Sequence, residues 1–363
     1  MPLFKLSRES LPSSHVKRMN ARWKVICITG IILLVMGSAV GADDYPELNL
    51  RYTNFLPEKA SHSQVDIWVA NEISRRTNGR VQIQLFHNQT LGKSTEIIDL
   101  VGGGAVDIGT ITFAYNFSRM PMLTFFNTPK IYKDHVIAAK LSKLGYQTQK
   151  TVREDMARNK LHPLFFRALN EFRLISKNPI RTLADFRDLR VRTFGAVHPK
   201  MFEKLGAVPV TMEWTDAYEA LMRGSVDAVY LSGTAFYSLK LFEAAPYISD
   251  VNFGAIVGYL TFVNLDLWNS WPKELKNLFH DIGIEAEHLS NRMVGESDQK
   301  SLELMIAAGA ELVHFQEQDQ LETLLPDTIN LVEERVASVG EHYEAPARRY
   351  AEFLREQLAK LNK

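Results

Sequence analysis

Segments with strand periodicity alternate with segments of helical periodicity twice along this chain, and that repetition constrains its fold more than any other feature. In residues 48–113, apolar residues recur at every second position around two helical segments, which gives a β-α-β-α-β order. The same rhythm returns on different residues in 164–231. Such alternation is typical of mostly parallel sheets covered by helices. The sequence therefore predicts an α/β protein with two such units.

The length of 363 residues exceeds what one hydrophobic core usually supports, so two lobes are expected. The prediction is a two-lobed clamshell with a hinge and long C-terminal helices, because residues beyond 273 have an almost entirely helical pattern. Ligands of open α/β sheets bind outside the carboxyl ends of the strands, here in the cleft between the lobes. We expect lobe I to comprise residues 43–170 and 257–296, and lobe II residues 171–256 and 297–363.

The N-terminal 42 residues have the pattern of a secretory signal peptide. A basic cluster precedes an apolar run at 25–40, and Val40-Gly41-Ala42 offers small residues for cleavage after Ala42. A membrane anchor is the alternative, although the apolar run is shorter than the roughly 20 residues that span a bilayer. Translation can start at Met1 or at Met19. Cleavage would remove Cys27, the only cysteine, so the exported protein would have no disulfide.

Composition and motifs exclude several classes of function. The formal net charge is zero, and no basic stripe indicates a nucleic-acid partner. The ten histidines show no metal-ligand spacing, and the sequence lacks the common phosphate-binding and hydrolase motifs. We therefore expect no cofactor, no metal and no enzymatic activity.

Three segments carry a family resemblance. Residues 74–112 contain Gln89-Thr90-Leu91-Gly92 and Gly104-Ala105-Val106-Asp107, residues 172–195 contain Pro179-Ile180 and Leu183-Ala184-Asp185-Phe186, and residues 205–229 contain Gly206-Ala207-Val208-Pro209, Tyr218-Glu219-Ala220-Leu221 and Gly224-Ser225-Val226-Asp227. In this order they resemble the solute-binding proteins of tripartite ATP-independent periplasmic (TRAP) transporters, dicarboxylate-binding type. Residues 267–275 give a weaker fourth match.

The resemblance implies that an arginine at the end of the 189–193 strand binds the substrate carboxylate, and by position this is Arg192. A guanidinium matches a carboxylate in plane with two parallel hydrogen bonds. The alternative is a surface arginine, because Arg190 lies two residues earlier on the same strand face. Arg173 is a second candidate ligand contact, and its alternative is an ion pair with Glu171 or Asp185.

The resemblance also implies an aromatic ligand contact at Trp214, for which ordinary helix packing is the alternative. Further candidates end strands or face the expected cleft: Phe113, Tyr115, Asn54, Asn170, Tyr230 and Phe253. Where many family members have a ligand-contacting Asn after Gly-x-Val-Asp, this chain has Leu231. The sequence therefore favours a monocarboxylate, keto acid or aromatic acid over a sugar acid, with the apolar body of the ligand among Trp214, Tyr230, Phe113 and Phe253.

The function that the resemblance implies is that of a periplasmic subunit that binds a small organic acid and delivers it to the membrane permease subunits of a transporter. Two other functions stay open at this point. One is the ligand-binding subunit of a periplasmic sensor, and the other is a periplasmic enzyme on the same fold. The genes beside this one would separate transport from sensing.

Overall fold

The computed structural model describes residues 45–325 and 327–361. The expected signal peptide, its cleavage site and Cys27 lie outside the described residues. No helix within the described ranges is long and apolar enough to cross a membrane.

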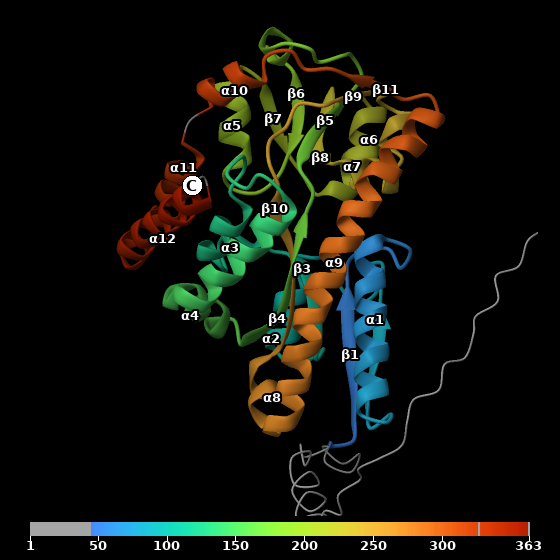
Figure 1. Cartoon of the computed structure of the whole chain (residues 1–363), viewed down its shortest axis with the longest axis vertical. Coiled ribbons are helices and arrows are strands. Elements are labelled where there is room, and N and C mark those ends of the chain that lie inside the picture. The colour runs from blue at the N-terminus through green and yellow to red at the C-terminus, as the bar shows by residue number, and fades with distance from the viewer. Residues whose placement is uncertain (1–44, 326, 362–363) are drawn as a thin grey trace, which may run out of the picture. The chain divides into compact units, whose positions relative to one another are not determined.

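Two mixed sheets organise the chain (Figure 1). The first has the strand order β2-β1-β3-β10-β4, with parallel pairing among its first three strands and antiparallel pairing of β10 on both sides. Its strands are β1 (Leu48–Asn54), β2 (Val81–Phe86), β3 (Ile108–Thr112), β4 (Leu161–Leu169) and β10 (Ile256–Asn264). The β-α-β-α-β prediction is confirmed, and β10 joins this sheet from much later in the chain.

The second sheet has the order β11-β9-β5-β8-β6-β7, in which β6 pairs in parallel with β7 and β8. Its strands are β5 (Phe172–Ser176), β6 (Arg190–Thr193), β7 (Val208–Thr211), β8 (Ala228–Ser232), β9 (Tyr247–Ser249) and β11 (Glu311–Val313). The second α/β unit is thus confirmed. The sequence analysis missed β9 and β11, which are three residues each and too short for a recognisable alternation.

Helices and 3₁₀ helices fill the connections. They are α1 (Ser61–Arg76), α2 (Ile97–Gly102), η2 (Phe113–Asn116), η3 (Pro121–Asn127), α3 (His135–Thr148), α4 (Lys150–Arg158), η4 (Leu183–Phe186), α5 (His198–Lys204), η5 (Trp214–Asp216), α6 (Ala217–Met222), α7 (Gly233–Ser238), η6 (Leu241–Glu243), α8 (Leu265–Ser270), α9 (Lys273–Ala307), α10 (Gln318–Leu324), α11 (Thr328–Ala337) and α12 (Glu341–Leu361).

Helix ends follow local chemistry. Asn78 and Gly79 both have positive φ after α1, as expected of a left-handed C-terminal cap. Ala60 precedes α1 without a side-chain cap, and Ser63 Oγ donates to the Pro57 carbonyl at 2.8 Å. Pro346 lies inside α12.

Long helix α9 connects the two halves of the fold. It contacts strand β4 of the first sheet, helix α1 beside that sheet and helix α7 beside the second (Figure 1). The last two helices differ from the expected assignment to lobe II, since α11 and α12 pack against η3, and α12 also contacts α3. The stack of Tyr350 on Phe125, with ring centroids 4.5 Å apart, shows why: large apolar side chains of α12 complete the core beside the first sheet.

Candidate ligand-binding site

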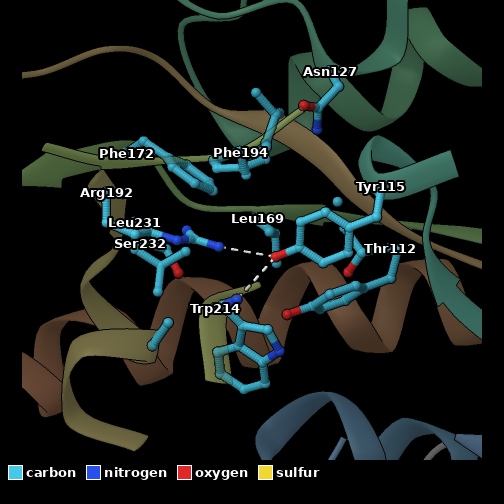
Figure 2. Close-up of a pocket in the computed structure, with 14 residues that line it drawn as sticks. Thr112, Tyr115, Asn127, Leu169, Phe172, Arg192, Phe194, Trp214, Leu231 and Ser232 are labelled. Atoms are coloured by element: carbon cyan, nitrogen blue, oxygen red, sulfur yellow. Dashed lines mark hydrogen bonds between the residues drawn. The ribbon is translucent and has the colours of Figure 1, made fainter. Parts of the chain in front are cut away.

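A small pocket lies between strand ends of the two sheets (Figure 2). Strands β3, β6 and β8 approach it with their carboxyl ends, as expected for ligand sites of α/β sheets. Its lining consists of Thr112, Tyr115, Asn127, Leu169, Phe172, Arg192, Phe194, Trp214, Leu231, Ser232, Ala235, Ile256, Gly258 and Tyr259.

Arg192 is the one charged residue of this lining, and its side chain is 0% exposed. It lies near the end of β6, where its Nη2 donates to the Met212 carbonyl at 2.8 Å and to Tyr115 Oη at 2.9 Å. Its Nη1 is 3.4 Å from the Tyr230 carbonyl. Among the described residues, no carboxylate lies within 4.0 Å of this guanidinium. Its hydrogen-bond partners are therefore all neutral.

Tyr115, from η2 beside the first sheet, reaches across the pocket to the second. Its phenol oxygen accepts from Arg192 Nη2 and, at 3.1 Å, from the backbone N–H of Trp214, as the dashed lines of Figure 2 show. Burial raises the pKa of Tyr115, so the phenol is neutral. Tyr115 thus links elements of both sheets at the position of the buried cation.

Apolar side chains form most of the remaining wall. Phe194 follows β6 and lies under the Arg192 guanidinium, whose Cζ is 5.3 Å from the ring centroid. Trp214 begins η5, and its indole packs edge-on to Phe55 with ring centroids 6.5 Å apart. The wall is completed by Leu169, Phe172, Leu231, Ala235 and Ile256. Such a lining suits a ligand with one anionic end and an apolar body.

Three of the predicted site residues are brought together here: Arg192, Trp214 and Tyr115. The structure also places Leu231 in the lining, at the position where the family resemblance has an asparagine. The sequence analysis missed Phe194 and Tyr259. Phe194 directly follows the strand that carries Arg192, so its position at a strand end was the available signal.

Three of the predicted aromatic contacts do not line this pocket. The apolar wall therefore consists of other residues than those expected from the sequence. Tyr230 points into the core of the second lobe, because side chains alternate along β8 and its neighbour Leu231 takes the pocket side. Phe253 packs there against Tyr230 and Phe202, with centroids 5.4 and 5.3 Å away. Phe113 packs against Phe126 beside the first sheet.

The remaining polar candidates also lie outside the lining, because each has protein partners elsewhere. Asn54 Nδ2 donates to Asp66, and its Oδ1 accepts from the Leu56 N–H at 2.8 Å. Asn170 Nδ2 donates to the Val294 carbonyl of α9 at 2.8 Å.

Arg173 likewise lies outside the pocket lining. It pairs with Asp298 of α9 at 3.9 Å, which is neither of the two partners considered from the sequence. Arg190 pairs with Asp227 and stays 45% exposed, consistent with a solvated role.

A second fully buried arginine, Arg167, was not singled out from the sequence. Its Nη1 is 3.1 Å from Asp66 Oδ1 and donates to the His62 carbonyl at 2.7 Å. Its Nη2 donates to the hydroxyls of Thr110 and Thr261 at 3.0 and 3.1 Å. The available signal was a charged residue inside the apolar strand pattern of 164–168. Arg167 therefore differs from Arg192 in having its own carboxylate.

Comparison with known proteins gives a consistent result. The sequence model of the family described as bacterial extracellular solute-binding protein, family 7, matches residues 57–324. The chain is 25% identical over 245 residues to the 2,3-diketo-L-gulonate-binding periplasmic protein YiaO of Escherichia coli, covering 66% of this chain and 73% of that protein. It is 26% identical over 242 residues to the C4-dicarboxylate-binding periplasmic protein DctP of Rhodobacter capsulatus, covering 66% and 71%.

Solved structures with the same fold include a TRAP periplasmic solute-binding protein from Roseobacter denitrificans with bound β-D-glucuronate. The TM-score is 0.72 at 20% identity, over 85% of this chain and 99% of that one. A second is a marine metagenome TRAP solute-binding protein specific for pyroglutamate, with a TM-score of 0.73 at 18% identity, over 86% and 100% of the two chains.

Proposed function

Since this chain belongs to the bacterial extracellular solute-binding proteins, family 7, we propose that it is the extracytoplasmic solute-binding subunit of a TRAP transporter. It binds a small organic acid in the pocket between the two sheets, with the ligand carboxylate on Arg192. The loaded protein then delivers the acid to the membrane permease subunits. Relatives described as periplasmic support a periplasmic location.

The observation that carries this proposal is the unmatched charge of Arg192. A buried ion is costly unless a counter-charge and hydrogen bonds compensate for it. Arg192 has hydrogen bonds to neutral groups but no carboxylate among the described residues, and its Nε also lacks an acceptor there. A ligand carboxylate would supply both the negative charge and the missing acceptor.

Substitution of Arg192 tests this function. Arg192→Met keeps the side-chain length and removes the charge, so binding of every carboxylate should weaken by about 2–5 kcal/mol, which is 30-fold or more. The ligand is first found by a thermal-shift screen of organic acids, and affinity is then measured by titration calorimetry. Arg190→Gln is the matched control, because Arg190 lies on the same strand, is exposed and pairs with Asp227.

The proposal predicts full affinity for Arg190→Gln and almost none for Arg192→Met. Calorimetry that gives Arg192→Met the affinity of the unmodified protein would refute the assignment. Circular dichroism of both variants shows that they are folded, so a loss of binding can be attributed to the guanidinium.

A further inference from the structure

The hydrogen bonds of Tyr115 determine what its phenol can still do. The oxygen accepts from Arg192 Nη2 and from the Trp214 backbone N–H, which uses both acceptor positions of a hydroxyl oxygen. The neutral phenol retains its proton, because burial raises its pKa. No acceptor for this proton is found among the described residues. Tyr115 therefore presents an O–H donor to the pocket that it lines.

Two further donors in the lining lack acceptors. Arg192 Nε and Trp214 Nε1 are both buried, and neither has a hydrogen-bond partner in the described part of the chain. Figure 2 shows the Tyr115 hydroxyl hydrogen-bonded to Arg192 and to the Trp214 backbone, so the three residues are neighbours in the pocket lining. Together they form a donor cluster, defined here as Tyr115, Arg192 and Trp214. Elements beside both sheets contribute to it.

The rest of the lining offers little to a ligand that carries donors of its own. It contains no carboxylate and consists mainly of Leu169, Phe172, Phe194, Leu231, Ala235 and Ile256. Asn127 has its amide nitrogen committed to the Val257 carbonyl at 3.1 Å. The other polar groups of the wall are the hydroxyls of Thr112, Ser232 and Tyr259 and the side-chain oxygen of Asn127. An ammonium group would therefore be buried without a counter-charge, and several ligand hydroxyls would have few polar partners, each at a cost in free energy.

We propose that the ligand is a monocarboxylate that the adjacent Tyr115 and Arg192 bind together, with an apolar body that carries no hydrogen-bond donors. This inference rests on the proposed function and narrows its substrate class. The carboxylate accepts hydrogen bonds from the Tyr115 hydroxyl and from Arg192 Nε–H, and the Trp214 indole N–H donates to a ligand acceptor. Branched, aromatic and 2-oxo acids fit these requirements, whereas sugar acids and amino acids do not.

A matched set of ligands tests the substrate class by calorimetry at pH 7. The set is 4-methylpentanoate, 4-methyl-2-oxopentanoate, L-leucine and D-galacturonate. The first two share the leucine skeleton without its ammonium group, and we expect them to bind at least 100-fold more tightly than L-leucine and D-galacturonate. Equal or tighter binding of D-galacturonate or L-leucine would overturn the proposal.

Tyr115→Phe tests the shared carboxylate, because it removes one hydroxyl and keeps the ring. We expect at least tenfold weaker binding of 4-methylpentanoate. The affinity for the uncharged 4-methylpentanamide should fall much less, because a neutral amide oxygen is a weaker hydrogen-bond acceptor than a carboxylate. A merely structural role of Tyr115 would weaken both ligands equally, and unchanged 4-methylpentanoate affinity would equally overturn the proposal. Full affinity of Arg192→Met for these acids would instead contradict the proposed function itself. Failure of the proposed substrate class and failure of the proposed function therefore give different results.

Discussion

Asp66 Oδ1 and Arg167 Nη1 lie 3.1 Å apart with neither side chain exposed to solvent. Tyr52 and Asn54 also donate to the Asp66 carboxylate, so the ion pair is embedded in a hydrogen-bonded network. Arg192 is equally buried but has only neutral partners. The same residue type therefore has two roles in one fold. One arginine is compensated by a carboxylate within the protein, and for the other we propose that the ligand supplies the counter-charge.

The buried pair should be important for stability. Asp66→Asn leaves the Arg167 charge buried without a counter-charge, so we expect the free energy of unfolding to fall by about 3–5 kcal/mol in urea denaturation. Asp227→Asn is the matched control, because it breaks the partly exposed pair with Arg190 and should cost about 1 kcal/mol or less. Similar losses in the two variants would contradict this account.

Stability should fall as the pH decreases from 7 to 5, in part because of His198. Burial lowers the pKa of this histidine to about 3, and its Nδ1 donates to the Phe194 carbonyl at 3.2 Å. Below about pH 6.5 the unfolded chain binds a proton that folded His198 does not, so unfolding is favoured as pH falls. For one such histidine the free energy of unfolding falls by about 2 kcal/mol between pH 7 and pH 5.

His198→Phe should remove this contribution to the pH dependence of stability. The measurement is the difference between the free energies of unfolding from urea denaturation at pH 7 and at pH 5. His280→Gln is the control for the loss of a histidine, because His280 is exposed. An unchanged pH dependence in His198→Phe would show that the folded protein takes up this proton as readily as the unfolded chain.

Leu231 should set the preference against hydroxylated acids. It lines the pocket at the end of β8, and Leu231→Asn would place an amide there that can donate and accept. We expect this variant to bind D-galacturonate at least tenfold more tightly than the unmodified protein, and 4-methylpentanoate more weakly. Leu231→Met, which keeps an apolar side chain, should retain the original order of affinities. Calorimetry showing no gain for D-galacturonate would mean that Leu231 does not face the ligand.

Gly145 should be required for packing of the C-terminal helix. A Cβ at this position of α3 would lie 1.8 Å from Tyr350 Oη and 2.7 Å from its Cζ. Gly145→Ala should therefore destabilise the protein by about 1–3 kcal/mol, despite the better helix propensity of alanine. At Gly295 in α9 the nearest atom would be 3.7 Å away, so Gly295→Ala should instead be neutral or stabilising by up to about 1 kcal/mol. Thermal denaturation that finds Gly145→Ala as stable as the unmodified protein would contradict this packing.

The fold could be predicted from local patterns because strand and helix periodicities are properties of short segments. This is why the strands around Leu50, Ile83 and Val191 were found, and why Arg192 could be placed at a strand end. The direction of a side chain within the fold depends on partners far away in sequence. Tyr230 turns into an aromatic core with Phe253, and Arg167 meets Asp66 about a hundred residues earlier in the chain. The partner of each side chain lies too far away in sequence for a local pattern to identify it.

The most direct measurement is a crystal structure of the protein with bound 4-methyl-2-oxopentanoate, or with an acid found in the thermal-shift screen. The account predicts a carboxylate within hydrogen-bond distance of Arg192 and of the Tyr115 hydroxyl, with the remainder of the ligand against Phe194, Leu231 and Ile256. A ligand bound away from Arg192, or an Arg192 guanidinium turned toward solvent in the complex, would contradict it.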